Sequence, residues 1–291
     1  MKILITGGTG FIGSHLVNSL VERELELVIL KRSTSDSWRI EESLDHVTCY
    51  NVDEISLQDI VKREKADFVL HLATNQRRQG DTIAQIIDSN VTFPSVLVEE
   101  AVQNGLQGFI NTDTSASGDH SLYASTKKAF LSVLNHFHTK NGLPVINLQL
   151  EYVYGPKDND SKFVPYLIKS ILCEESIDAS PGTQKRDFIY VQDAADAYIK
   201  AMELVKQMDN QFFSLAIGSG ESISLKEFAE TVARLSSKRT RINWGALDFR
   251  KGDIFESKAD ITAAKEILGW NPNHNLKQGL EKTINWFREC I

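Results

Sequence analysis

KILITGGTGFIGS, residues 2–14, is the stretch of sequence that decides the fold. The short apolar run Lys2–Thr6 predicts a strand, and residues Ile12–Glu22 have the apolar spacing of a helix. A strand and a helix joined by a short glycine-rich loop form the first half of a βαβ unit. The stretch therefore predicts that the chain begins an α/β fold with a parallel sheet.

Three glycines of this loop, Gly7, Gly10 and Gly13, are spaced three residues apart. The first allows a tight turn, and the second lets the backbone approach a pyrophosphate. The third lets the helix pack on the sheet with its N-terminal N–H groups facing the anion. No Gly-Lys-Ser/Thr follows, which argues against a nucleoside triphosphate P-loop. The loop predicts a dinucleotide site, and a tight turn without a ligand is the alternative.

Apolar runs and helical patterns alternate through the first half of the chain. The runs lack a clean two-residue alternation, so we expect strands covered on both faces, in a Rossmann-type doubly wound parallel sheet with right-handed crossovers. The further strands expected are Leu25–Leu30, His46–Tyr50, Asp67–Leu72, Gly108–Thr112, Pro144–Leu150 and Phe212–Ile217, and the further helices are Ile83–Gln103, Tyr123–Lys140 and Asp193–Val205. After Gly155 the pattern loosens. We expect a dinucleotide-binding domain of residues 1–155 plus 187–217 and a smaller mixed α/β substrate domain of residues 156–186 plus 218–291.

Composition limits the classes of function. The 291 residues carry a net charge of −7, with 24% charged and 42% hydrophobic residues, which excludes disorder and argues against a nucleic-acid surface. Cys49, Cys173 and Cys290 are far apart, so the sequence predicts no disulfide framework and no metal site, and it suits the reducing cytoplasm. No stretch approaches 18 consecutive apolar residues, so we expect no membrane partner.

The choice of dinucleotide follows from charge. The second strand is expected to end at Leu30, and Lys31 and Arg32 follow it. A carboxylate at this position accepts from the ribose 2′-hydroxyl of NAD, whereas cations attract the 2′-phosphate of NADP. The pair therefore predicts NADP(H), with two solvated loop cations as the alternative. Asp53, after the third strand, is expected to reach the adenine amino group or to serve as a plain turn aspartate.

A tyrosine and a lysine four residues apart open one of the predicted helices. Of the seven tyrosines, Tyr123 alone has a lysine at this spacing, Lys127, and positions i and i+4 share one helix face. At roughly 6 Å and an effective dielectric of about 20, an ammonium attracts a phenolate by ~3 kcal/mol, or about two pK units. We therefore expect the pKa of Tyr123 to fall below its usual value of about 10, as a general acid or base requires. A surface helix pair is the alternative.

Together these residues resemble the extended short-chain dehydrogenase/reductase family, in its nucleotide-sugar branch of NAD-dependent epimerases and dehydratases. The resemblance covers nearly the whole chain. TGGTGFIG matches the family's cofactor loop, and Tyr123 with Lys127 matches its active-site pair. RDFIYVQD at 186–193, RKGD at 250–253 and LGWNP at 268–272 match its later signatures.

The resemblance implies roles for particular residues. Thr112, at the end of the fifth strand, is implied to bind the substrate oxygen that Tyr123 protonates. Lys127 is implied to bind the nicotinamide ribose as well, and Arg186 and Arg250 are implied to clamp the substrate diphosphate. Competitors for the hydroxyl role are Thr114, Ser115 and Ser117. The implied cofactor contacts are Gly7, Gly10, Phe11, Ile12, Lys31, Arg32, Asp53, Leu72, Ala73, Tyr123 and Lys127.

The chain departs from the family pattern at three places. Only eleven residues separate Thr112 from Tyr123, so the loop that normally covers the sugar is largely absent. Tyr152 replaces an asparagine that would touch the phosphates. Thr114 stands where dehydratases of this branch carry a glutamate that removes a carbon-bound proton, and a threonine cannot act as that base.

These features favour a reductase. We expect NADPH-dependent reduction of the C4 ketone of a nucleotide-linked 4-keto-6-deoxyhexose, in deoxysugar biosynthesis for a surface polysaccharide such as lipopolysaccharide. The short loop and QKRDFIY, residues 184–190, are similar to bacterial CDP-paratose and abequose synthases. The alternatives are a nucleotide-sugar 4-epimerase with bound NAD and a non-catalytic NADP-sensing protein. The resemblance also implies a homodimer through the helices Ile83–Gln103 and Tyr123–Lys140.

Overall fold

The chain divides into two compact units. The structure is a computed structural model that describes residues 1–23, 25–76, 80–238, 240–249 and 252–291. The first unit comprises Met1–Gln149, Ala195–Leu215 and Ile267–Gly269, and the second unit comprises Leu150–Ala194, Ala216–Glu266 and Trp270–Ile291. Residues 150–155 and 187–194, expected in the dinucleotide-binding domain, therefore fall in the second unit.

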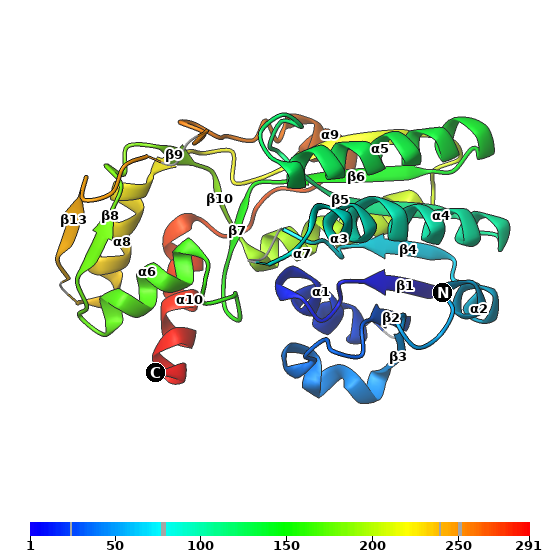
Figure 1. The fold of residues 1–291 in the computed structure, drawn as a ribbon, viewed down its shortest axis with the longest axis horizontal. Helices are drawn as coiled ribbons and strands as arrows, with labels where there is room; N and C mark the ends of the chain where they lie inside the picture. Colours follow the sequence, from blue (N-terminus) through cyan, green and yellow to red (C-terminus); the bar gives the residue numbers. More distant parts are fainter. Residues whose placement is uncertain (24, 77–79, 239, 250–251) are drawn as a thin grey trace. The chain divides into compact units, whose positions relative to one another are not determined.

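The first unit is built on a parallel sheet of the Rossmann type, as the sequence predicts (Figure 1). Among the described residues seven strands form it, in the order β11-β6-β5-β4-β1-β2-β3. They are β1 (Lys2–Thr6), β2 (Glu26–Lys31), β3 (Val47–Asn51), β4 (Phe68–His71), β5 (Gly108–Thr114), β6 (Val145–Leu150) and β11 (Phe212–Ile217). The strand order reverses at β1, since β2 and β4 flank it on opposite sides. In open α/β sheets ligands bind outside the carboxyl ends of the strands at such a reversal.

Helices cover both faces of this sheet, which explains the apolar runs in its central strands. On β5, a Cβ added to Gly108 would lie 2.5 Å from Val205 of α7, while the ring of the next residue, Phe109, packs on Phe130 of α5. Consecutive residues of a strand point to opposite faces, so α7 and α5 lie on opposite faces. The helices of this unit are α1 (Phe11–Val21), a 3₁₀ helix (Trp38–His46), α2 (Leu57–Glu64), α3 (Ile83–Ile87), α4 (Phe93–Gln103), α5 (Leu122–Asn141) and α7 (Val191–Val205), whose first four residues belong to the second unit. Most of α9 (Thr262–Leu268) belongs to the second unit.

The expected continuous helix Ile83–Gln103 is wrong in one respect. One π-helical turn, Asp88–Thr92, separates α3 from α4. Pro94 lies at the beginning of α4 and has no backbone N–H to give to the preceding turn. The side chain of Asn90, within the π turn, bonds outside the helix and donates to the backbone oxygen of Asn75 at 2.9 Å.

The second unit consists of short strand pairs and helices. β7 (Tyr152–Tyr154) pairs with β10 (Phe188–Tyr190), β9 (Lys185–Arg186) with β12 (Ile223–Ser224), and β8 (Ile177–Ala179) with β13 (Ile242–Trp244). Its helices are α6 (Phe163–Leu172), α8 (Leu225–Ser236) and α10 (Leu276–Cys290). Among the described residues of both units, no helix is long and apolar enough to cross a lipid bilayer.

Gly13→Ala tests the packing of the glycine loop. A Cβ at Gly13 would lie 2.1 Å from the backbone oxygen of Gly7, so either the helix or the loop must move. We expect a loss of about 1–3 kcal/mol in the free energy of unfolding, typical of overpacking, measured by denaturant titration. The matched control is Gly10→Ala, whose Cβ would meet only the same oxygen, at 3.1 Å. Equal losses in the two variants would contradict this account.

Candidate active site

The glycine loop has the features of an anion site at the beginning of α1. Gly7 has a φ of +73°, and a Cβ there would lie 2.6 Å from the backbone nitrogen of Ala73. Gly10 is the N-cap of α1, and the first turn of that helix, which begins with Phe11 and Ile12, carries no acidic side chain. The positive end of the helix is therefore not neutralised by its own side chains. These residues fit the pyrophosphate of a dinucleotide.

The chain that follows β4 lies against this loop. The backbone N–H of Leu72 donates to the Thr6 backbone oxygen at 3.0 Å, and that of Ala73 donates to the Thr6 hydroxyl at 3.2 Å. Leu72 and Ala73, both expected to touch the cofactor, are thereby held beside Gly7 at the carboxyl end of the sheet.

The end of β2 carries the two predicted cations. Lys31 is the last residue of β2, and Arg32 follows it with an exposed side chain. The carboxylate of Asp53 accepts from the backbone N–H of Ser33 at 2.8 Å and from its hydroxyl at 2.6 Å. Asp53 thus shapes the turn after Arg32, which is the turn role that the sequence left open. Its pKa is lowered mainly by the Ser33 hydrogen bonds, and the charge of Arg32 contributes.

Helix α5 presents the tyrosine–lysine pair. The hydroxyl of Ser121 caps the helix by accepting from the backbone N–H of Ala124 at 3.2 Å, so Tyr123 lies in its first turn. Lys127 is 1% exposed, and its Nζ has no hydrogen-bond partner among the described residues. A buried ammonium without a partner is costly unless a ligand completes the site. Lys127 therefore fits a role as donor to a cofactor ribose.

The expected pKa of Tyr123 is wrong in sign. Burial, together with the charge of Asp113, raises the pKa of Tyr123 to about 12, although hydrogen bonds from Thr74 and Gln76 act to lower it. Burial lowers the pKa of Lys127 to about 8, against the raising effect of Asp113. Desolvation disfavours both charged forms and is the largest cause of both shifts, whereas the attraction to Lys127 on which the expectation depended is not among the causes of the Tyr123 shift.

The two threonines at the end of β5 have different partners. The hydroxyls of Thr112 and Tyr198, a fully buried residue of α7, lie 2.6 Å apart. Thr114 accepts from the backbone N–H of Ala116 at 3.2 Å, and its hydroxyl hydrogen is not used in that bond. Because strand side chains alternate, both threonines point to the same side of β5, and Asp113 points to the other.

Asn90 joins several segments near Tyr123, and the sequence analysis missed it. Its side-chain oxygen accepts from the backbone N–H of Asn75 at 2.7 Å and from Thr74 at 3.3 Å, while its nitrogen donates to the hydroxyl of Thr126 at 3.0 Å. Thr126 donates in turn to the backbone oxygen of Tyr123 at 2.8 Å. A buried polar residue within an amphipathic helix, shortly before Pro94, was the signal available in the sequence.

The implied diphosphate clamp belongs to the second unit. Arg186 is 5% exposed, lies over the ring of Tyr152 at 5.3 Å, and donates to Asp253 at 2.6 Å and to the Lys185 backbone oxygen at 2.8 Å. Its guanidinium has five N–H donors, so these two bonds leave others for an anion. Arg250 lies outside the described residues.

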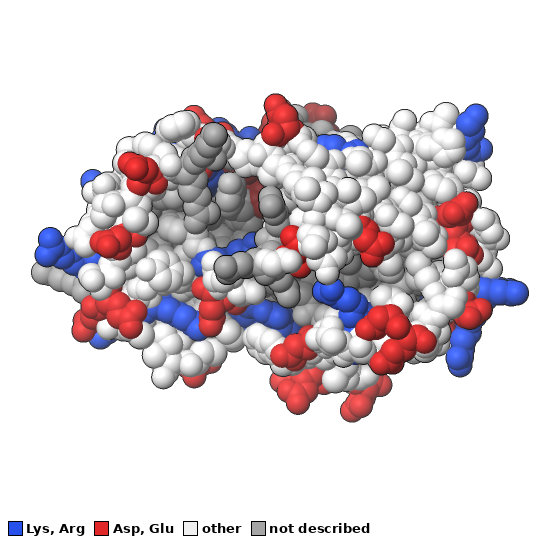
Figure 2. All heavy atoms as spheres, viewed as in Figure 1, with Lys and Arg blue, Asp and Glu red and all other residues white. Residues whose placement is uncertain are grey.

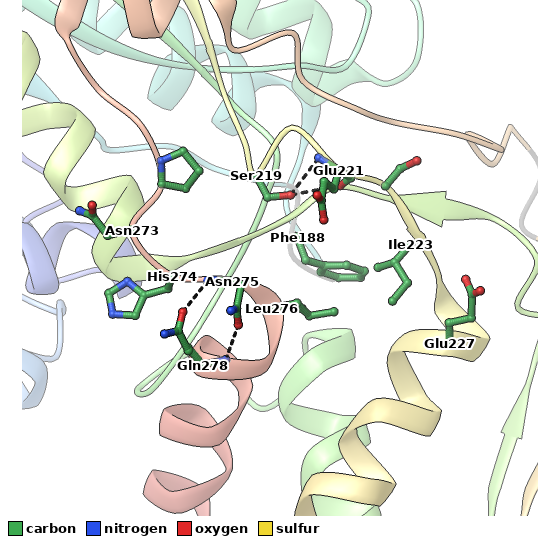
Figure 3. A pocket seen from close by; sticks show the side chains of 12 residues that line it. Phe188, Ser219, Glu221, Ile223, Glu227, Asn273, His274, Asn275, Leu276 and Gln278 are labelled. Atoms are coloured by element: carbon green, nitrogen blue, oxygen red, sulfur yellow. Dashed lines mark hydrogen bonds between the residues drawn. The ribbon is translucent and has the colours of Figure 1, made fainter.

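A cavity of about 620 Å³ in the second unit is a weaker candidate for the reacting site (Figure 3). Several of its polar groups already have partners within the protein. Asn275 and Gln278 form the capping box of α10, and Nδ1 of His274 lies 2.8 Å from Oδ1 of Asp193. Its lining, drawn from the described residues, includes none of the residues predicted for the site. On the face drawn in Figure 2, acidic and basic side chains are interspersed, without one wide basic area among the described residues.

Comparisons with known proteins identify the relatives of this chain. The chain is 30% identical over 292 residues to a CDP-abequose synthase of Salmonella muenchen, covering 98% of this chain and 97% of that protein. It is 28% identical to a UDP-glucuronate 4-epimerase of Thermodesulfobacterium geofontis, covering 99% and 96%. The structure of a UDP-glucose 4-epimerase of Thermotoga maritima with UDP-glucose matches with a TM-score of 0.88 and 26% identity, covering 100% and 99%.

A family model matches residues 3–216, which include the glycine loop, the end of β2 and the Tyr123/Lys127 pair. The chain therefore belongs to the NAD dependent epimerase/dehydratase family, whose members use an NAD(P) dinucleotide to modify nucleotide sugars.

Proposed function

We propose that this enzyme reduces the C4 ketone of a nucleotide-linked 4-keto-6-deoxyhexose with NADPH. The observation that carries the proposal is the Tyr123/Lys127 pair of α5, whose buried Lys127 Nζ has no hydrogen-bond partner among the described residues. The two cations at the end of β2, where we expect the 2′-phosphate of NADP, support the choice of cofactor. The similarity to CDP-abequose synthase, a nucleotide-sugar enzyme by its name, makes a CDP-linked substrate the first to test.

Lys31 and Arg32 support NADPH over NADH. The carboxylate of Asp53, which approaches this turn, has both of its oxygens bonded to Ser33. Arg32 is exposed beside it, and charge-assisted hydrogen bonds from a guanidinium to a phosphate are strong. When bound, NADPH supplies the hydride equivalent for C4.

Tyr123 acts as the proton donor. Because its pKa is raised to about 12, the phenol carries its proton throughout the neutral range, as reduction of a ketone requires. Proton transfer to the carbonyl oxygen leaves a phenolate, which the ammonium of Lys127 stabilises electrostatically. We assign the hydroxyl that orients the carbonyl to Thr114, because the Thr112 hydroxyl already has Tyr198 as a partner.

Arg186 binds the substrate diphosphate in this proposal. Its guanidinium is fixed by Asp253 and stacked on Tyr152, so it presents its remaining donors with little loss of side-chain freedom. Arg250, which lies outside the described residues, is proposed as the second arginine of the clamp.

A 4-epimerase is the second candidate, because solved and curated relatives include UDP-sugar 4-epimerases. An epimerase takes a hydride from its substrate and returns it, so it keeps one NAD bound. Copurified NAD and turnover without added NADPH would favour it over the reductase.

The first prediction is the reaction itself. Incubation with CDP-, dTDP- and GDP-4-keto-6-deoxyhexoses should oxidise one NADPH per C4 alcohol formed, followed at 340 nm and by NMR of the product. Tyr123→Phe should lower kcat by about 10²–10⁴-fold while dinucleotide binding is retained, because only the proton donor is removed. Thr114→Val should lower kcat more than Thr112→Val. Consumption of none of these substrates would refute the proposal.

The second prediction concerns cofactor choice. Arg32→Met should weaken NADPH binding by roughly 10- to 100-fold, the equivalent of one charge-assisted hydrogen bond, and leave NADH binding unchanged. Fluorescence titration with both cofactors measures this. Arg63→Met, which removes a 75% exposed arginine of α2, is the matched control. A wild-type protein that prefers NADH would end the argument from charge.

The third prediction concerns pH. Lys127 must be protonated to stabilise the phenolate, and its pKa is lowered to about 8. Activity is therefore expected to be full below this value and to fall as the pH rises through it, in kcat/KM against pH. Lys127→Arg keeps its charge at all these pH values, so any remaining activity should lack this alkaline fall. The same fall in that variant would assign it to another group.

A further inference from the structure

An ion pair between a half-buried lysine and a buried aspartate lies directly beside the tyrosine–lysine pair, and the mechanism above does not use it. Lys128, the residue after Lys127, places its Nζ 2.7 Å from Oδ2 of Asp113 and 2.9 Å from the backbone oxygen of Thr114. The Asp113 side chain is fully buried. Lys128 therefore ties α5, which carries Tyr123 and Lys127, to the end of β5.

Both oxygens of Asp113 are occupied by hydrogen-bond donors. Oδ1 accepts from the backbone N–H of Thr114 at 2.8 Å, and Oδ2 accepts from the Asn147 side chain at 3.1 Å as well as from Lys128. Asn147 is fixed in turn, since it donates to Ser214 at 2.8 Å and accepts from Asn111 at 2.7 Å. These bonds fix the Asp113 carboxylate at the end of β5.

Asp113 is the negative charge that faces both members of the active pair. It raises the pKa values of Tyr123 and Lys127, whereas the charge of Lys128 lowers that of Lys127. Within the part of the chain that the structure describes, two other titratable groups face the pair: His71 of β4 and Tyr198 of α7. Burial, then the charge of Lys127, lowers the pKa of His71 well below its usual value, and burial raises that of Tyr198, so both are neutral.

We propose that Asp113 and Lys128 are positioning residues of the active site. Asp113 supplies the buried counter-charge that keeps the Lys127 ammonium protonated. Lys128 holds that carboxylate at the end of β5, so that Asp113 does not bond to Lys127 and the Lys127 ammonium stays available. The absence of any hydrogen-bond partner of Lys127 Nζ among the described residues fits this division of roles. This inference deepens the proposed function. It rests on that function for any effect on turnover, but the test below measures the pKa of Lys127 and does not depend on it.

The two members of the pair should shift the ionisation of Lys127 in opposite directions. In the full-length protein labelled with [ε-¹³C]lysine, the Lys127 signal is assigned by its loss in Lys127→Met and titrated by NMR. Asp113→Asn removes the counter-charge and should lower the Lys127 pKa by about one unit. Lys128→Met removes a neighbouring cation and should raise it by a similar amount. Lys2→Met, which breaks the Lys2–Glu64 pair at the start of β1, should leave it unchanged.

Opposite shifts require that both charges act on Lys127, because an ion pair remote from its ammonium would shift its pKa in neither direction. Shifts of the same sign, or no shift in either variant, would overturn the proposal. Removing one partner of a buried pair is destabilising, so the double variant Asp113→Asn/Lys128→Met provides a second measurement. It removes both charges and should bring the Lys127 pKa between those of the single variants, and a value outside that interval also counts against the proposal. The titration needs no substrate, so it stays decisive even if no keto sugar is turned over.

Discussion

The active site depends on an ammonium group that the fold removes from water. Lys127 is 1% exposed on a helix that packs over the sheet. Burial is the largest cause that lowers its pKa to about 8, with the charge of Lys128 lowering it further and that of Asp113 raising it. An ion in such a place persists only if nearby charges and a ligand compensate for its lost hydration. Asp113 supplies the nearby negative charge. The glycine loop, at the carboxyl end of the sheet, fits the dinucleotide that would be the ligand.

Most of the fold and half of the site follow from short-range sequence signals. The glycine spacing, the apolar runs and the tyrosine–lysine spacing each reflect a local constraint: a close backbone approach, burial on both faces, or one helix face. These signals locate the loop at Gly7–Gly13, the sheet and the active pair. The sequence also predicts the two cations at the end of β2 and a turn role for Asp53, because each follows directly from where a strand ends.

What the sequence does not give depends on groups far apart in the chain. Thr112 pairs with Tyr198, and Lys128 pairs with Asp113. The distances between these residues along the sequence match no local motif, so the sequence gives no sign of either contact. The sign of the Tyr123 pKa shift depends on how deeply the phenol is buried, which no local pattern reports. Attraction to Lys127 was the single effect visible in the sequence, whereas desolvation is the largest cause of the shift.

The raised pKa of Tyr123 bears on the direction of the chemistry. An epimerase needs the same phenol first as a base toward a sugar hydroxyl and then as an acid toward a ketone. At neutral pH a phenol with a pKa of about 12 is almost entirely protonated, which is the form that donates to a ketone. A ketoreductase uses this donation in its forward direction. The burial of Tyr123 and the counter-charge of Asp113 therefore suit the reduction that we propose.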